Sequence, residues 1–296
     1  MRSGAETELV DSSSLVGDWR ALRQRIAEDG YVFFRGLLDR ARVESIGRSG
    51  LTALQQDGWL VPGLDPVTAA PRPPVRAVRM RDAFSDRGYQ RVLFDPGFNR
   101  IPFDSQLADV MGQILGPEGV CYPLKLPRIV YPSSLVPRQP GGYVHKDYGS
   151  VQDMFTSWVP LGDVPASLGG LAVLPGSQRS SMVTPRPLER LEQGWRTTDY
   201  EPGDVLVFHC MTTHAALPNR EQRMRFSAEY RWQLADQPAP RRMVLAPQGQ
   251  ELGSRAFQDT TWWRPVLPRL TLFDDGGVDA APRVPAPTSR YVTMTT

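Results

Sequence analysis

Seven short β-rich runs follow one another after Gly116, and this pattern constrains the fold more than any other feature of the sequence. The runs are separated by Pro, Gly, Asn and Asp, which favour turns. Many short strands at such spacing are typical of an antiparallel sandwich or barrel. We expect strands at 121–131, 143–147, 154–160, 170–174, 204–209, 213–217 and 225–233.

Before Gly116 the sequence carries the signals of helices instead. Asp18 can cap a helix that runs to about Asp29, and residues 31–34 (Tyr-Val-Phe-Phe) form a predicted strand after it. A second helix should start near Asp39. The clearest helix is predicted over 104–115, because its apolar residues recur at i, i+3, i+4, i+7 and i+8. These residues are Leu107, Val110, Met111, Ile114 and Leu115.

No obvious linker separates the helical part from the β-rich part, so we expect a single domain over residues 1–296. Within it we distinguish a mostly helical part with a Pro-rich loop (1–116), a β core (117–235) and a C-terminal extension (236–296). The fold class is therefore mainly β with flanking α.

Charge and cysteine content narrow the classes of partner and compartment. The 34 Lys and Arg residues balance 32 Asp and Glu residues and form no basic block, so we expect no nucleic-acid or membrane partner. No apolar run approaches the ~18 residues of a membrane span, and the N-terminus lacks the apolar stretch of a signal peptide. Cys121 and Cys210 are too few for a disulfide framework. We expect a cytoplasmic protein.

The chain contains only three histidines, His145, His209 and His214, and one of them stands in a His-x-Asp motif. In an extended strand, residues two apart point to the same face, so His145 and Asp147 can take adjacent positions on one metal ion, while Lys146 points away. A second imidazole, from His209 or His214, would complete a 2-His-1-carboxylate site, which suits Fe(II) and O2 chemistry.

The sequence around the two later histidines helps to separate their roles. His209 shares a predicted strand face with Val205 and Val207, which favours a hydrogen-bonded, half-buried imidazole over a metal ligand. Arg225 follows His214 by eleven residues. A dicarboxylate cosubstrate needs a fixed cation at its far end, and the planar fork of Arg binds carboxylates bidentately. Arg223 lies two residues earlier, and spacing alone does not decide between the two arginines.

These residues lie within a longer series of motifs whose order and spacing resemble the phytanoyl-CoA dioxygenase-like family of Fe(II)/2-oxoglutarate oxygenases over about residues 20–235. The motifs are Glu28-Asp29-Gly30-Tyr31-Val32, Arg35-Gly36-Leu37-Leu38, His145-x-Asp147, Trp158-Val159-Pro160-Leu161, Gly169-Gly170-Leu171-Ala172-Val173-Leu174-Pro175-Gly176-Ser177, Gly203-Asp204-Val205-Leu206-Val207-Phe208, His214 with Pro218-Asn219, and Arg225.

The resemblance implies a fold and a set of site residues. The fold would be a double-stranded β-helix, or cupin-like jelly roll, braced by N-terminal helices. His145, Asp147 and His214 would bind iron, and these three residues would form the catalytic centre. Arg225 would bind the distal carboxylate of 2-oxoglutarate, and Trp158 would line the cosubstrate pocket. Where the family often has a histidine after Pro-Gly-Ser, this chain has Gln178, for which we expect little functional consequence.

The function implied is that of an Fe(II)/2-oxoglutarate-dependent dioxygenase that hydroxylates a small-molecule specialised metabolite with O2, forming succinate and CO2. Related halogenases lack the carboxylate ligand, so Asp147 favours oxygen insertion. Loop 60–74 and segment 179–200 are candidates for a substrate lid. Desaturation, epoxidation or cyclisation by the same chemistry remain alternatives, as do a zinc-dependent hydrolase and a catalytically silent jelly-roll binding module.

Overall fold

The computed structural model describes residues 7–76, 83, 85–137, 142–147, 153–181, 183–240 and 272–273. Helices dominate up to Gly116 and strands follow, as expected from the sequence. The helices are α1 (Trp19–Asp29), α2 (Arg40–Gln56), α4 (Arg87–Leu93), α5 (Pro96–Arg100) and α6 (Ser105–Leu115). The strands are β1 (Tyr31–Phe34), β2 (Gly119–Cys121), β3 (Leu126–Val130), β4 (Phe155–Pro160), β5 (Leu171–Val173), β6 (Val205–His209), β7 (His214–Ala216), β8 (Arg225–Leu234), β9 (Ala239–Pro240) and β10 (Leu272–Phe273).

A large antiparallel sheet forms the centre of the molecule. Its strands lie in the order β1-β6-β4-β8-β2, and β3 also pairs with β8. The N-terminal strand β1 closes one edge by pairing with β6, so that Phe34 lies opposite Val205. The sheet therefore takes one strand from the helical part and the others from the β core.

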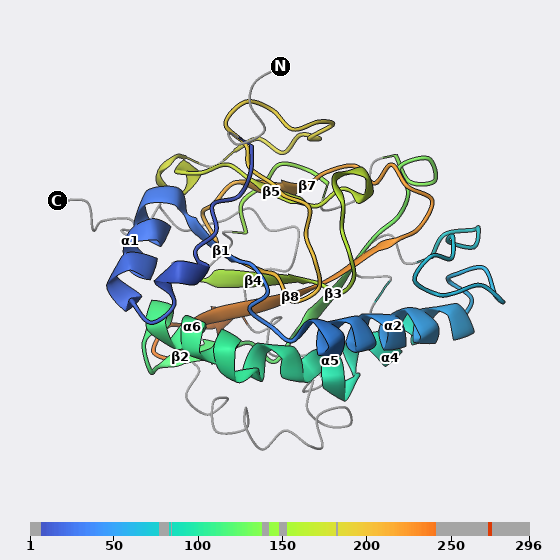
Figure 1. The fold of residues 1–296 in the computed structure, drawn as a ribbon, viewed down its shortest axis with the longest axis horizontal. Helices are drawn as coiled ribbons and strands as arrows, with labels where there is room; N and C mark the ends of the chain where they lie inside the picture. Colours follow the sequence, from blue (N-terminus) through green and yellow to red (C-terminus); the bar gives the residue numbers. More distant parts are fainter. Residues whose placement is uncertain are drawn as a thin grey trace.

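A smaller sheet lies across from the large one. β5 and β7 pair in antiparallel fashion, and single bridges extend this pair on both sides, from His145 to His214 and from Arg196 to Val173. Figure 1 shows β5 and β7 above the large sheet, with α2, α5 and α6 along its opposite side. This arrangement is the jelly roll braced by N-terminal helices that the sequence predicts.

Side chains along the strands of the large sheet alternate between its two faces, and this alternation produces two separate hydrophobic cores. On β1, Val32 and Phe34 pack into the cluster that includes the helices, whereas Tyr31 and Phe33 pack between the two sheets. Strand β6 divides its side chains in the same way. This period of two is a consequence of the pleat, because successive side chains point to opposite faces.

The helix predictions for the N-terminal part are confirmed. Asp18 accepts hydrogen bonds from the Arg20 and Ala21 amides at the start of α1, and Gly30 ends that helix with a left-handed φ of 81°. Asp39 caps α2 and Asp104 caps α6. The residues predicted as the apolar stripe of α6 are all buried. The strand predicted at 31–34 is present as β1.

Two of the strand predictions are wrong in extent. The run 121–131 divides into β2 and β3, because residues 122–125 stand opposite only residues 230–231 of β8, and Pro123 has no N–H to donate to a ladder. The run 143–147 forms isolated bridges at Tyr143 and His145 rather than a regular strand. The other five predicted strands correspond to β4, β5, β6, β7 and β8.

The segments suggested as lids differ in how they are held. Loop 60–74 has no helix or strand, and a single bridge between Leu60 and Pro71 pins it. The other segment, 179–200, contributes Leu188 and Trp195 to the buried apolar cluster that includes Ala172 and Ala215 of the small sheet.

Most of the predicted extension 236–296 lies outside the described residues. In the described part of the chain, no helix is long and apolar enough to cross a membrane.

Two helical glycines provide a matched test of this packing. A Cβ added at Gly47 in α2 would stand 1.8 Å from the Leu161 carbonyl oxygen, whereas one added at Gly112 in α6 meets nothing within 4 Å. We expect Gly47→Ala to lower the free energy of unfolding by about 1–3 kcal/mol through overpacking. Gly112→Ala should raise it by about 0.5–1 kcal/mol through helix propensity. Urea denaturation of both variants checks this, and unchanged stability of Gly47→Ala would contradict the packing described.

Candidate metal centre and cosubstrate pocket

The backbone of the small sheet brings two of the three histidines together. The amide of His145 donates to the carbonyl of His214 and the amide of His214 donates to the carbonyl of His145, both over 3.0 Å. Residues that exchange both hydrogen bonds in an antiparallel pair project their side chains from the same face. The two imidazole centroids consequently lie 4.2 Å apart.

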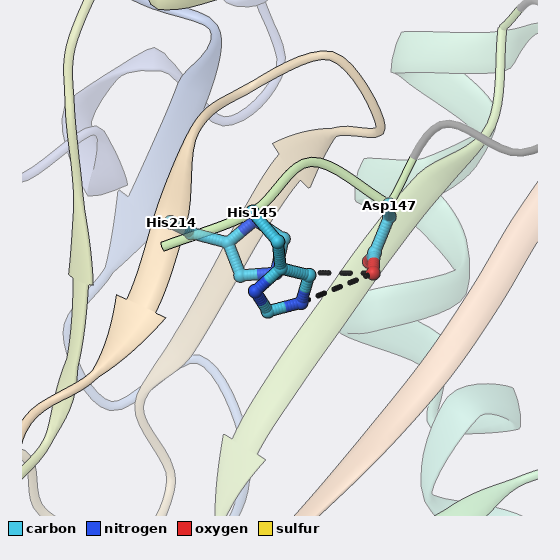
Figure 2. A group of neighbouring side chains, drawn as sticks. All are labelled: His145, Asp147 and His214. Atoms are coloured by element: carbon cyan, nitrogen blue, oxygen red, sulfur yellow. Dashed lines mark ion pairs between the residues drawn. The ribbon is translucent and has the colours of Figure 1, made fainter. Parts of the chain in front are cut away.

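Asp147 completes the group, two residues beyond His145. Its Oδ1 lies 3.8 Å from Nε2 of His145 and 3.8 Å from Nε2 of His214. Figure 2 shows both rings directed toward this carboxylate. The three candidate ligand atoms lie within 4.8 Å of one another, as expected for groups that can surround one ion. The 2-His-1-carboxylate set predicted from the sequence is therefore assembled, with His214 and not His209 as the second imidazole.

Hydrogen bonds to the backbone set the tautomer of both histidines. Nδ1 of His145 lies 2.7 Å from the Tyr143 carbonyl oxygen, and Nδ1 of His214 lies 3.0 Å from the Thr212 carbonyl oxygen. A carbonyl can only accept, so each Nδ1 carries the proton and each Nε2 keeps its lone pair for a metal. Burial, together with the neighbouring His145, lowers the pKa of His214 to about 4, so its imidazole is neutral at pH 7.

Two side chains orient the carboxylate. The Thr156 hydroxyl donates to Oδ2 of Asp147 over 2.9 Å, and Nη2 of Arg231 lies 3.4 Å from Oδ1. Burial alone would raise the pKa of Asp147, but Arg231, the two imidazoles and the Thr156 hydrogen bond outweigh it and lower the pKa. The carboxylate is therefore ionised, with Oδ2 fixed and Oδ1 directed toward the imidazoles.

Arg225 supplies a buried cation between the sheets, as expected for a group that binds a distant carboxylate. Its Nη1 donates to the Gly169 carbonyl over 2.6 Å, and its guanidinium carbon lies 5.7 Å from the centroid of the Trp158 ring. Among the described residues no carboxylate forms an ion pair with it within 4 Å. Burial and the nearby Arg128 lower the pKa of Arg225 to about 10, as expected for a cation that lacks an adjacent anion.

Three buried polar atoms around Arg225 have no hydrogen-bond partner in the described part of the chain. They are Nε of Arg225, Nε1 of Trp158 and Oγ of Ser227. Buried donors are normally satisfied, so such a group indicates that a ligand completes it. All three atoms can donate a hydrogen bond, which fits a carboxylate. The residues present therefore fit a dicarboxylate cosubstrate whose far end lies at Arg225.

Arg223 does not share this pocket, which corrects the expectation from its spacing. β8 begins only at Arg225, so the alternation that would place both arginines on one face does not extend back to Arg223. The Nε of Arg223 pairs with Glu221 over 2.7 Å, and its Nη2 donates to the Asp163 carbonyl. Of the two arginines, Arg225 is therefore the one that lies beside Trp158 and the one that stays the candidate for binding a carboxylate.

His209 lies on the other face of the sheet, in the position expected for a structural histidine. Its Nδ1 accepts from the Met211 amide over 3.2 Å, and its Nε2 lies 3.4 Å from Oδ1 of Asp153. Burial would lower the pKa of His209, but Cys210 and Asp153 raise it to about 9. The ring is buried more completely than expected, with an exposed fraction of 1%.

Sequence reasoning missed Thr156, Ser227 and Arg231. Ser227 and Arg231 lie two and six residues after Arg225 within one predicted strand, so the period of two already placed all three on the same face. That signal was available. Thr156 could not be found in this way, because its contact with Asp147 joins two different segments of the chain, and periodicity within one strand does not encode such a contact.

Comparison with known proteins places the chain in a family. The model of the phytanoyl-CoA dioxygenase (PhyH) family matches residues 26–227. The chain belongs to this family. It is accordingly an oxygenase that uses iron and 2-oxoglutarate, and His145, Asp147 and His214 can hold the iron.

Individual relatives are more distant. The chain is 29% identical to a 1-deoxypentalenic acid 11-beta-hydroxylase of Streptomyces arenae over 72% of this chain and 79% of the relative. It is also 29% identical to the enzyme of the same name from Streptomyces exfoliatus, over 87% and 90%. The crystal structure of EctD from S. alaskensis in its apoform shares the fold, with a TM-score of 0.52 at 15% identity, over 84% of this chain and 89% of that chain.

The hydrogen bond from Thr156 to Asp147 provides a test of the metal centre. Removing the hydroxyl in Thr156→Val leaves Oδ2 without its donor, and loss of such supporting contacts typically weakens metal binding about 10- to 100-fold. Thr156→Ser keeps the hydroxyl and should bind metal as the wild type does. Anaerobic titration with Fe(II) compares the three proteins. Equal affinities for all three would show that Thr156 does not support a metal ligand.

Proposed function

We propose that this oxygenase hydroxylates an aliphatic carbon of a small-molecule specialised metabolite. The two Streptomyces relatives are named as hydroxylases of 1-deoxypentalenic acid, and this supports both the reaction and the class of substrate. The observation that carries the proposal is the group of His145, Asp147 and His214, whose ligand atoms lie within 4.8 Å of one another.

In this proposal each site residue has a defined task. His145 and His214 offer their Nε2 atoms to Fe(II), and Asp147 offers Oδ1. Arg225 binds the distal carboxylate of 2-oxoglutarate, with Trp158 donating an indole N–H. When bound, the iron activates O2 and couples the oxidative decarboxylation of 2-oxoglutarate, which yields succinate and CO2, to oxidation of the substrate.

The protein contributes position and exclusion of water. Trp158 is fully buried, with its ring centroid 4.8 Å from that of Tyr200, and the His214 ring lies 4.5 Å from the Phe208 ring at a tilt of 48°. These rings close the inter-sheet space around the pocket. A charge-assisted hydrogen bond at Arg225 is strong in such a dry environment, so the cosubstrate is held in one orientation.

A zinc-dependent hydrolase would use the same two histidines and carboxylate, but it gives Arg225 no task. A buried arginine without a carboxylate within ion-pair distance among the described residues costs stability unless an anion joins it. The surrounding donors on Trp158 and Ser227 add to that cost. A cosubstrate with a second carboxylate accounts for all three groups, and this favours the oxygenase.

The direct test is formation of succinate. With Fe(II), 2-oxoglutarate, O2 and 1-deoxypentalenic acid as a trial substrate, we expect succinate only when the metal and both cosubstrates are present, and none from His145→Ala. We also expect slow succinate formation without a matched substrate, so the test does not depend on the trial compound. Absence of succinate from the wild type, with Zn(II)-supported hydrolysis that ignores 2-oxoglutarate, would overturn the proposal.

The two arginines give a matched pair within the same assay. Arg225→Gln should raise the KM for 2-oxoglutarate about 10- to 100-fold, because hydrogen bonds to a charged group are worth about 1.5–3 kcal/mol. Arg223→Gln removes only a partly exposed ion pair and should leave KM within about twofold. If both variants raised KM equally, the pocket would not lie at Arg225.

A further inference from the structure

Lys146 stands between the two metal-binding residues of the His-x-Asp motif, yet it is buried, with an exposed fraction of 6%. Its Nζ donates to the Ser177 carbonyl over 2.7 Å, to the Ser180 carbonyl over 2.9 Å and to the Ser180 hydroxyl over 3.2 Å. An ammonium group has three protons, so these contacts satisfy it completely. The segment that carries His145 and Asp147 is therefore fastened to the turn at 177–180.

The same turn also holds the segment that carries His214. The amide of Thr213, the residue before His214, donates to the Ser177 hydroxyl oxygen over 2.8 Å. That hydroxyl donates in turn to the Leu174 carbonyl over 2.5 Å, and the Leu174 amide donates to the Thr213 carbonyl over 2.9 Å. Ser177 consequently contacts both segments, with its carbonyl oxygen on one and its hydroxyl on the other.

The turn is itself anchored on helix α1. The side-chain amide of Gln178 donates to the Ala27 carbonyl over 2.8 Å, Nη1 of Arg179 donates to the same carbonyl over 2.7 Å, and the Gly176 amide donates to the Asp29 carbonyl over 2.9 Å. These bonds satisfy carbonyls in the last turn of α1, which have no partner within the helix. The turn thus has a rigid base outside both metal-binding segments.

From these contacts we infer that Lys146 and Ser177 form a clamp that positions the three metal ligands before the metal binds. The inference rests on the proposed metal site and concerns residues that touch neither metal nor cosubstrate. Among the described residues, a single bridge joins the segment of His145 to that of His214, so further contacts are needed to hold the two segments in one register. Fastening both to one turn supplies such contacts before binding, and a preorganised site binds its ion more tightly.

The chain supplies a matched control, because its only other lysine is also buried on backbone carbonyls. Nζ of Lys125 donates to the Tyr122 and Pro123 carbonyls over 3.2 Å, within the turn between β2 and β3. Lys146→Met and Lys125→Met remove the same group from similar surroundings. We expect both to lower the thermal unfolding temperature of the metal-free protein, but only Lys146→Met to weaken anaerobic Fe(II) binding, by tenfold or more.

A second pair of variants tests the other arm of the clamp with less risk to folding. Ser177→Ala should weaken Fe(II) binding severalfold, and Ser177→Thr, which keeps the hydroxyl, should restore it. Because the ligands are intact, excess Fe(II) should return kcat of Lys146→Met and Ser177→Ala toward the wild-type value, unlike His145→Ala.

The outcomes separate the clamp from the proposed function. Suppose that the wild type binds Fe(II) and that Ser177→Ala binds it as the wild type does. If the two lysine variants then lose affinity equally, or if neither loses affinity, the clamp is wrong while the metal site stands. If the wild type binds no Fe(II), the proposed function fails first. Selective loss in Lys146→Met, with rescue by Ser177→Thr, supports the clamp.

Discussion

The paired backbone hydrogen bonds between His145 and His214 are the interaction on which the candidate site depends. They fix which face of the small sheet both imidazoles project from, and they set the separation of the rings. Asp147 lies two residues after His145, so in an extended segment its side chain projects from the same face as the His145 imidazole. The register between these two segments brings the three candidate ligand atoms together. A slip of one residue would turn the His214 side chain toward the opposite face of the sheet and separate the ligand atoms.

The second determinant is the division of β8 into two faces. Phe226, Ala228 and Tyr230 pack toward the helices, and the alternate residues point between the sheets. That inner face carries Arg225, Ser227, Glu229 and Arg231. Glu229 pairs with Arg128 over 3.0 Å, and Arg231 lies beside Asp147.

An interior with this many charges is costly unless each has a partner. In the described structure Arg225 is the member of this row without a carboxylate at ion-pair distance. The same strand therefore stabilises the fold with one face and prepares a place for an anion with the other. Helices α2 and α6 lie along the apolar side of the sheet in Figure 1.

Much of this arrangement was predictable from the sequence, and the failures have physical causes. Local signals located the helix cap at Asp18 and the start of the helix near residue 104, because capping is decided within one turn of the chain. The extra residues at 122–125 were not predictable, since a bulge is visible only once the partner strand is known. The choice between Arg223 and Arg225 depended on where β8 begins.

The three candidate metal ligands, which the structure brings together, were named from the His-x-Asp motif and the family resemblance, whereas the residues that contact them were not. Thr156, Ser177 and Lys146 act through contacts between segments distant in sequence, and no periodicity reports such contacts. His209 was distinguished from His214 by its strand face and by the family resemblance at His214, and its contacts with Met211 and Asp153 agree with a structural role.

One measurement tests the central claim most directly: an anaerobic crystal structure of the protein with Fe(II) and 2-oxoglutarate. We predict that Nε2 of His145, Nε2 of His214 and Oδ1 of Asp147 bind the iron, that Oδ2 keeps its bond to Thr156, and that the far carboxylate of 2-oxoglutarate lies on Arg225. Iron bound elsewhere, or a cosubstrate whose far carboxylate lies away from Arg225, would contradict the account.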